Sequence, residues 1–282
     1  MRADLRHLPV LVALLAPGLL VLAVLLAAPF VTILLASVLD KYPGATHNTL
    51  VHYRNFLLDS YYLHILFRTF ALALVVTLIC AVIGYPLSWY LAWGRPRWKH
   101  WVFLCVITPL LVSIVVRTLG WTIVLGNEGL INNTLLGAGL IAEPLPLMNN
   151  FWSVTLGMVH VLLPFMILSI ASVLARIDRS LTEAAFTLGA QPVRAFMRVT
   201  LPLSIQGIAT GSVIVFCLTV GAYVTPMWLG RGHVTLMAMT IYDQMIALVD
   251  WPAGAATSIV LTAGTLLLLL AYGLSTARFA RR

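Results

Sequence analysis

The chain has 282 residues, of which 61% are hydrophobic and only 9% are charged. Soluble domains usually carry about 25% charged residues. This composition, with a mean hydropathy of +1.00, therefore excludes an ordinary soluble domain and indicates a protein embedded in the lipid bilayer. The formal net charge is +8, but the basic residues lie in short loops between apolar runs. That distribution is typical of membrane topology and not of a nucleic-acid-binding face.

The first apolar run begins close to the N-terminus. No charged residue lies between Leu8 and Leu39. The apolar region of a cleaved signal peptide is usually about 7–15 residues long, so this run is much too long for one. We expect an uncleaved first transmembrane helix.

Six apolar segments are long enough to cross a bilayer, because a spanning helix needs about 20 apolar residues. Unpaired backbone groups are costly in lipid, so these segments should be helices. The sequence predicts an all-α, polytopic membrane protein that forms one transmembrane domain over residues 1–282. The expected spans are about 10–38, 64–93, 101–126, 149–175, 203–229 and 253–277.

The basic residues predict the orientation of these spans, because cytoplasmic loops carry an excess of Lys and Arg. One side of the membrane holds only Lys41, Arg54 and Arg231. The other side holds Arg2, Arg6, Arg95, Arg97, Lys99, Arg176, Arg179, Arg194, Arg198, Arg278, Arg281 and Arg282. The N- and C-termini, together with the loop at 176–202, are therefore expected in the cytoplasm.

Polar residues within the spans are few, although such residues often mark function. Arg117 is expected near the outer end of the third span, as an anchor or structural partner rather than a ligand. His160 lies in the middle of the fourth span, where we expect a hydrogen bond to a neighbouring helix. The fifth span contains Gly221-Ala222-Tyr223-Val224-Thr225-Pro226, which favours a kink or local unwinding. That break is either a gate or pathway segment of a transporter, or ordinary helix bending.

The loop at 176–202 has its own helix signals. Ser180 and Glu183 have the spacing of a capping box. Gly189 suits the left-handed position just past a helix, and Pro192 suits the first turn of a second helix. Leu201-Pro202 is expected to end that second helix before the fifth span. The loop should thus hold two short helices joined by a glycine turn.

The same loop carries residues that suit contact with another protein. Ala184 and Ala185 remove side-chain bulk, while Phe186, Val193 and Phe196 place apolar groups in a polar loop. An exposed apolar patch of this kind usually marks a protein interface. The alternative is an amphipathic helix lying against the bilayer.

The full pattern of the loop resembles the EAA loop, E-A-A-x3-G-x9-I-x-L-P, of permease subunits in bacterial binding-protein-dependent ABC importers (type I). Each fixed letter is present except the Ile, which is Val199 here. Residues 176–202 are therefore called the EAA-like loop below. Further segments resemble the spermidine/putrescine class of these permeases, and related importers for opines, other amines or iron carry similar ones. These segments are 84–86, 127–132, 162–166, 241–244 and 250–256.

This resemblance implies six helices, a multi-pass location in the bacterial inner membrane, and several protein partners. The partners would be ATP-binding subunits, a second permease subunit in a heterodimer, and a periplasmic solute-binding protein, besides membrane lipid. It also implies that the ATPase is coupled through Glu183, Ala184, Ala185, Gly189 and Pro202. The pattern G-x-x-x-x-G-K-[ST] is missing from the sequence, so ATP and Mg²⁺ should be bound by the partner ATPase and no cofactor by this chain. We expect no catalytic residue, no metal site and no nucleic-acid partner.

A small cationic solute such as a polyamine should meet carboxylates, hydroxyls or aromatic faces along its path. The candidates are Glu128, Asp243 and Asp250 at the outer mouth, and Tyr223, Thr225 and Trp228 along the fifth span. The acids could instead cap helices, and the aromatic residues could belong to an interfacial belt. Two other function classes are a stand-alone secondary carrier and an intramembrane enzyme. Both are disfavoured, because no carboxylate lies in the middle of a span.

Overall fold

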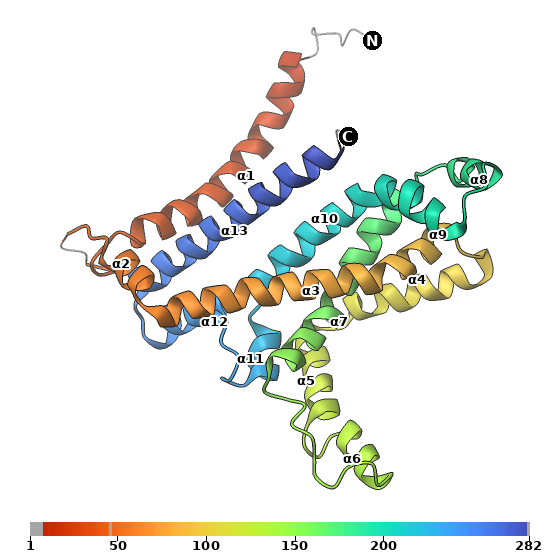
Figure 1. Ribbon diagram of the computed structural model, residues 1–282. Coiled ribbons are helices and arrows are strands. Elements are labelled where there is room, and N and C mark those ends of the chain that lie inside the picture. The colour runs from red at the N-terminus through yellow and green to blue at the C-terminus, as the bar shows by residue number, and fades with distance from the viewer. Residues whose placement is uncertain (1–7, 45–46, 281–282) are drawn as a thin grey trace. The chain divides into compact units, whose positions relative to one another are not determined.

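The computed structural model describes residues 8–44 and 47–280, and within these residues the regular structure is helical (Figure 1). In chain order the elements are α1 (Leu8–Ala36), α2 (Val51–Leu58), α3 (Ser60–Trp93), α4 (Pro96–Leu111), α5 (Ile114–Leu125), α6 (Leu130–Gly137), α7 (Phe151–Leu174), α8 (Ser180–Thr187), α9 (Pro192–Ala195), the π-helical turn η2 (Phe196–Thr200), α10 (Leu201–Val220), α11 (Val224–Gly230), α12 (Met237–Tyr242), the π-helical turn η3 (Asp243–Ala247) and α13 (Trp251–Ala280). Six helical stretches among the described residues are long and apolar enough to span a membrane, which confirms the predicted number.

The residues form two compact units. The smaller unit comprises the chain up to Ser60 together with Ile241–Gly264, and the larger unit comprises Tyr61–Thr240 and the chain from Thr265 onward. Each unit is described by itself below.

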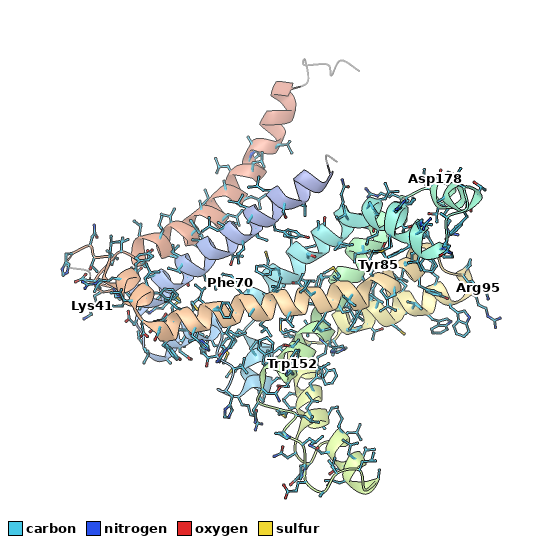
Figure 2. The ribbon with its side chains drawn as sticks, in the orientation of Figure 1. Lys41, Phe70, Tyr85, Arg95, Trp152 and Asp178 are labelled. Carbon is cyan, nitrogen blue, oxygen red and sulfur yellow. The ribbon has the colours of Figure 1, made fainter. Side chains whose placement is uncertain are left out.

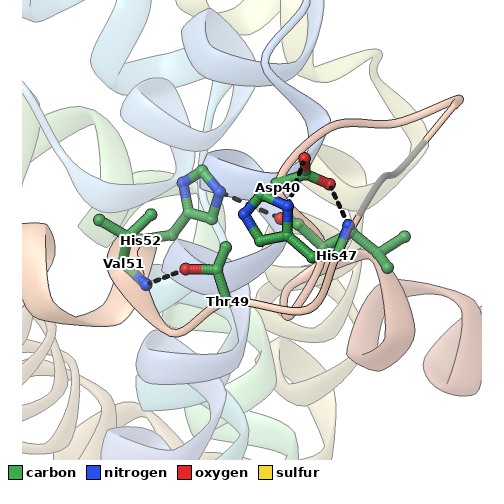
Figure 3. A network of polar contacts seen from close by, with 6 residues as sticks. Asp40, His47, Thr49, Val51 and His52 are labelled. Carbon is green, nitrogen blue, oxygen red and sulfur yellow. Dashed lines mark hydrogen bonds and ion pairs between the residues drawn. The ribbon is translucent and has the colours of Figure 1, made fainter.

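In the smaller unit, the segment between α1 and α2 is tied down by polar contacts (Figure 3). An Asp40 carboxylate oxygen lies 3.4 Å from Nδ1 of His47, and the Thr49 hydroxyl accepts the N–H of Val51 at 3.2 Å. The ring of His52 contacts the carbonyl of Leu39 at 3.1 Å. The connection after the first span is therefore a folded segment, and it carries the short helix α2.

The core of the larger unit is centred on α7, which packs between α3 and α10. Fully buried side chains from the three helices, such as Val76, Met166 and Val215, form one cluster. Small residues let the backbones approach closely: the Ser88 hydroxyl on α3 donates to the Ile167 carbonyl at 2.9 Å. A Cβ at Gly207 on α10 would lie 3.0 Å from Cα of Ile170. Such small-residue contacts are the usual basis of helix association in lipid, where the hydrophobic effect does not drive it.

The prediction of one third span at 101–126 is wrong. Two helices, α4 and α5, occupy this stretch, and Val112 and Ser113 between them have extended backbone. Pro109 in the last turn of α4 cannot donate a helical hydrogen bond, which weakens the helix just before the break. Apolarity alone could not reveal this break, because the residues on both sides of it are equally apolar. The third helical stretch that is long and apolar enough to span a membrane is Ile114–Gly137.

The prediction of the fifth span at 203–229 is wrong at its start and confirmed at its break. The helix begins at Pro192, inside the EAA-like loop, and continues to Val220. Gly221–Tyr223 then interrupt it before α11 begins at Val224, so the kink predicted at Gly221–Pro226 is confirmed.

Candidate functional site

The EAA-like loop lies at the end of the larger unit where α3 ends and α4 begins. The guanidinium carbon of Arg179 lies 5.9 Å from the ring centre of Trp93, the last residue of α3. Figure 2 shows Asp178, Tyr85 and Arg95 toward this same end. The basic residues around the start of α4 and the EAA-like loop are thus neighbours in space, as expected if both lie on the same side of the membrane.

The start of α8 differs from the expected capping box. Ser180 is the first residue of the helix and not its cap, and Arg179 at the cap position makes no side-chain cap hydrogen bond. Asp178 takes over this role, because its carboxylate accepts the N–H of Ser180 at 3.0 Å. Hydrogen bonds from the Ser180 N–H and then from its hydroxyl lower the pKa of the Asp178 carboxyl. Glu183 is left exposed in the first turn, where its charge suits the positive end of the helix.

The glycine turn after α8 is confirmed. Gly189 has φ of +80°, its N–H donates to the Phe186 carbonyl at 2.9 Å, and the N–H of Ala190 donates to the Ala185 carbonyl at 3.0 Å. These two bonds are those of a Schellman motif, which satisfies the last carbonyls of a helix. The direction of the chain between α8 and α9 is therefore set by backbone hydrogen bonds.

The prediction that Leu201-Pro202 ends the second helix is wrong. Pro192 begins α9 as expected, but the helix then passes through η2 into α10 without interruption. The N–H of Leu201 donates to the carbonyl of Phe196, five residues back. This wider turn shifts the hydrogen-bond register next to Pro202, whose ring would collide with a carbonyl in a regular α-helix. The EAA-like loop is thus rigidly continuous with a membrane-spanning helix.

Five large apolar side chains of the loop are exposed. Leu181 is 48% exposed, and Phe186 is 46%, Leu188 87%, Val193 73% and Met197 55% exposed. Phe196 lies instead against Tyr85 of α3, with ring centres 5.4 Å apart and nearly perpendicular planes. Phe186, Leu188, Val193 and Met197 are called the apolar ridge below. Two of its members, Leu188 and Met197, were not predicted, although Leu188 could have been found because it directly precedes the turn glycine.

The expected coupling residues lie around this ridge. Ala184 is exposed, and Ala185 is half-buried. Pro202 is exposed at the base of α10, beyond η2. The loop therefore brings together Glu183, Ala184, Ala185 and Gly189 within α8 and its turn, while Pro202 belongs to the spanning helix.

Three candidate path residues lie at or just after the break in the fifth span. Thr225 is buried, and its hydroxyl lies 3.2 Å from that of Thr118 on α5. Its methyl group would lie 2.9 Å from a Cβ on Gly157 of α7, so Thr225 packs α11 against two helices. Tyr223 is half-buried at the break, and Trp228 is 38% exposed.

The three acidic candidates lie in loops and turns. Glu128 is exposed in the turn between α5 and α6, and its backbone carbonyl accepts the Asn133 side-chain amide at 2.9 Å. In the smaller unit, Asp250 accepts the N–H of Ala253 at 3.1 Å, as the cap of α13. Asp243 is exposed at the start of η3. The capping alternative considered for the acids thus applies to Asp250.

A polar cluster that the candidate path did not include joins α5 and α7. Trp121 Nε1 donates to Nδ1 of His160 at 3.1 Å, which confirms the hydrogen bond predicted for His160. Arg117, one turn before Trp121, has its Nε and Nη1 atoms buried without a hydrogen-bond partner among the described residues. The Arg117 side chain is half-buried.

No group of three or more His, Cys, Asp or Glu side chains that could hold a metal ion occurs within the described ranges. The features with functional character are therefore the EAA-like loop at one end of the larger unit, the broken fifth span, and the Arg117 cluster. The exposed apolar side chains of the EAA-like loop suit contact with another protein.

Comparisons with known proteins agree with this geometry. Residues 84–282 match the family described as "Binding-protein-dependent transport system inner membrane component". The chain is 35% identical over 216 residues to the spermidine/putrescine transport system permease protein PotB of Escherichia coli (strain K12), covering 77% of this chain and 78% of that protein. It is 32% identical over 224 residues to the protein of the same name from Haemophilus influenzae, covering 79% and 78%.

A solved structure shares the fold. A chain of a bacterial alginate ABC transporter, in complex with an alginate pentasaccharide-bound periplasmic protein, superposes with a TM-score of 0.80 at 17% identity. The match covers 98% of this chain and 97% of that one. At this identity the likeness concerns the fold alone.

Proposed function

This chain belongs to the family of binding-protein-dependent transport system inner membrane components, and we propose that its EAA-like loop docks onto a separate ATP-binding subunit. The chain is a permease subunit of an ABC importer and a multi-pass inner-membrane protein. In the proposed assembly, residues 1–282 act as one permease domain that pairs with a second permease subunit. A periplasmic binding protein delivers the solute, and both chain termini lie in the cytoplasm with the loop.

The apolar ridge is the observation that carries the docking proposal. It places four apolar side chains in a polar loop, on a helix end fixed by the Schellman motif at Gly189. Because η2 joins the loop to α10 without a break, a force on the ridge reaches the fifth span directly. Closure of an ATPase dimer would therefore move α10 and the break at Gly221–Tyr223 that follows it.

Charge on the ridge tests this proposal. Leu188→Glu and Val193→Glu alter side chains that are 87% and 73% exposed, so the fold should survive. Binding of the ATP-binding subunit should fall by at least about tenfold, because an unpaired charge would be buried at the contact. The matched control is Leu140→Glu, at a residue that is 72% exposed in the segment before α7. Binding to the purified permease complex is measured by titration. Unchanged affinity in both ridge variants would refute docking at this surface.

We further propose that the transported solute is a polyamine. Support comes from the names of the relatives at 35% and 32% identity and from the candidate path residues Glu128, Tyr223, Thr225, Trp228, Asp243 and Asp250. The complete transporter, reconstituted in proteoliposomes with its binding protein and internal ATP, should take up labelled putrescine or spermidine. Uptake without the ATP-binding subunit would favour a stand-alone carrier instead.

A second candidate solute is an amine that carries a carboxylate, such as an opine. The observation that favours it is Arg117, whose buried Nε and Nη1 atoms have no acceptor in the described part of the chain. A carboxylate is the natural bidentate partner of a guanidinium. In the same uptake assay, an opine that inhibits uptake of the labelled solute, where spermidine does not, would support this candidate. Loss of the inhibition by the opine in Arg117→Gln would indicate that its carboxylate binds at Arg117.

A further inference from the structure

A groove of about 550 Å³ opens between α3, α4 and α7, at the end of the larger unit that carries the EAA-like loop. One wall is apolar and includes Leu91, Phe103 and Leu168. The rim is polar, with Lys99, His100 and Ser172. The groove is therefore amphipathic, because polar and apolar side chains line it together.

The rim lies at the level of a membrane interface. Trp89, Trp98 and Trp101 are 45%, 57% and 61% exposed around the same turn. Exposed tryptophans of this kind gather where lipid headgroups meet the hydrocarbon region. A ligand held by the rim would thus sit at headgroup depth, and the apolar wall would face the acyl chains.

The charge on the rim is not balanced within the groove. No carboxylate lines the groove, and the first turn of α4 holds no acidic residue. The Lys99 ammonium donates to the Ala92 carbonyl at 3.3 Å, which uses one of its three donors. Arg95 and Arg97 add further positive charge at the start of this helix, where the helix dipole disfavours cations.

We propose that this groove binds the headgroup phosphate of an anionic phospholipid. Lys99 and His100 contact the phosphate, and the acyl chains lie along Leu91, Phe103 and Leu168. Basic pockets between transmembrane helices are suited to such lipids, since both the headgroup charge and the chains are recognised. The ligand lies beside α7, the helix that leads into the EAA-like loop.

The experiment measures lipid retention by the full-length chain, purified in a non-ionic detergent and supplied with equal amounts of phosphatidylglycerol and phosphatidylcholine of matched acyl chains. Native mass spectrometry counts the lipids that remain bound. The unaltered chain should retain phosphatidylglycerol in preference to phosphatidylcholine. The double variant Lys99→Gln/His100→Gln should lose this preference, by about fivefold for the Lys99 charge alone.

Two further variants locate the site. Lys41→Gln, the same substitution at the chain's other lysine, should retain phosphatidylglycerol as the unaltered chain does. Ser172→Trp keeps the charges but fills the groove from its exposed rim, and should also abolish retention. Because Ser172→Trp leaves Lys99 and His100 in place, it tests the proposal even if the double variant does not fold.

Any of four results would overturn the proposal: equal retention of the two lipids, an equal loss in Lys41→Gln, full retention in Ser172→Trp, or displacement of the lipid by soluble glycerol phosphate at equal concentration. The last result would mean that the phosphate alone is recognised and that the apolar wall contributes nothing.

Discussion

At the residue scale, the backbone conformation of Gly189 restricts which residues can occupy this position. An ideal Cβ at this residue would meet no atom within 4 Å, so space does not exclude a side chain. The backbone does, because φ of +80° lies in the region that L-residues other than Asn and Asp rarely enter. The restriction is therefore conformational.

Replacing Gly189 with valine should separate conformation from contact. The left-handed conformation costs about 1–2 kcal/mol for such a residue, which must be supplied whenever the loop docks in its present shape. We expect the apparent affinity for the ATP-binding subunit to fall by a factor of about 5–30, measured by titration. Gly189→Asn, which tolerates the conformation, is the control and should lose much less. Equal losses in the two variants would show that the turn geometry is not what matters.

The stability of the same loop should depend on pH through the carboxyl group of Asp178. Its carboxyl pKa is lowered by the hydrogen bonds from Ser180. When the pKa of a carboxyl is lower in the folded protein than in the unfolded chain, where it is about 3.9, the ionised carboxylate stabilises the fold. This stabilisation is fully present at pH values above the unfolded-chain pKa, and it is lost as the pH falls through the folded-protein pKa. Carbon-13 NMR of labelled aspartates, assigned with Asp178→Asn, should find Asp178 titrating below the ordinary range.

Ser180→Ala serves as the control for this titration. It removes the hydroxyl but keeps the backbone N–H, which is the larger cause of the shift. The pKa of Asp178 should therefore return only part of the way. A titration of Asp178 at or above the ordinary aspartate value in the unaltered chain would contradict the capping geometry.

At the element scale, α7 and α10 form the closest-packed helix pair of the larger unit. A Cβ at Gly207 would lie 3.0 Å from Cα of Ile170 and 3.1 Å from the Ser169 carbonyl oxygen. These are backbone atoms, which cannot move aside as a flexible side chain can. The contact therefore depends on glycine at this position.

Gly207→Ala should destabilise the protein although alanine is the better helix former. The propensity gain is about 1 kcal/mol, and overpacking costs about 1–3 kcal/mol. Gly273→Ala, in α13, is the matched control, because a Cβ there meets nothing within 4 Å. Thermal unfolding in detergent should give a lower Tm for Gly207→Ala and an equal or higher Tm for Gly273→Ala. A rise in Tm in both variants would disprove the close contact.

Helix breaks show how far an element can be predicted. Pro226 and Gly221 together marked the break after α10 correctly, because both residues weaken a helix. Pro202 was expected to stop a helix and did not, since η2 shifts the hydrogen bonds around it. The break at Val112 had only Pro109 as a signal. A proline thus indicates a disturbance in the helix, and the packing around it decides its form.

At the scale of the whole molecule, the length of α7 determines that the segments before and after it lie on opposite sides of the bilayer. It is one uninterrupted helix of 24 residues, about 36 Å long at 1.5 Å per residue, and the hydrocarbon core is about 30 Å thick. The segment before α7 and the EAA-like loop after it must therefore lie on opposite sides of the bilayer.

Single cysteines can establish which side is which. Leu188→Cys and Leu140→Cys place thiols at residues that are 87% and 72% exposed. With a membrane-impermeant maleimide, Leu188→Cys should react only in inverted inner-membrane vesicles, and Leu140→Cys only in right-side-out ones. The unaltered chain, with Cys80, Cys105 and Cys217, gives the background. Labelling of Leu188→Cys from the outer side would reverse the proposed orientation.

The sequence by itself determined the class of this protein, the number of spans, and the identity and turn of the EAA-like loop. Each of these depends on local information: the length of an apolar run, the fixed letters of the loop, or the conformational freedom of Gly189. The tertiary structure alone decided that Phe196 packs inward on Tyr85 while Leu188 stands exposed. It also decided that Thr225 holds three helices together. Those outcomes depend on which helices become neighbours, which is a property of packing between distant segments and not of any one of them.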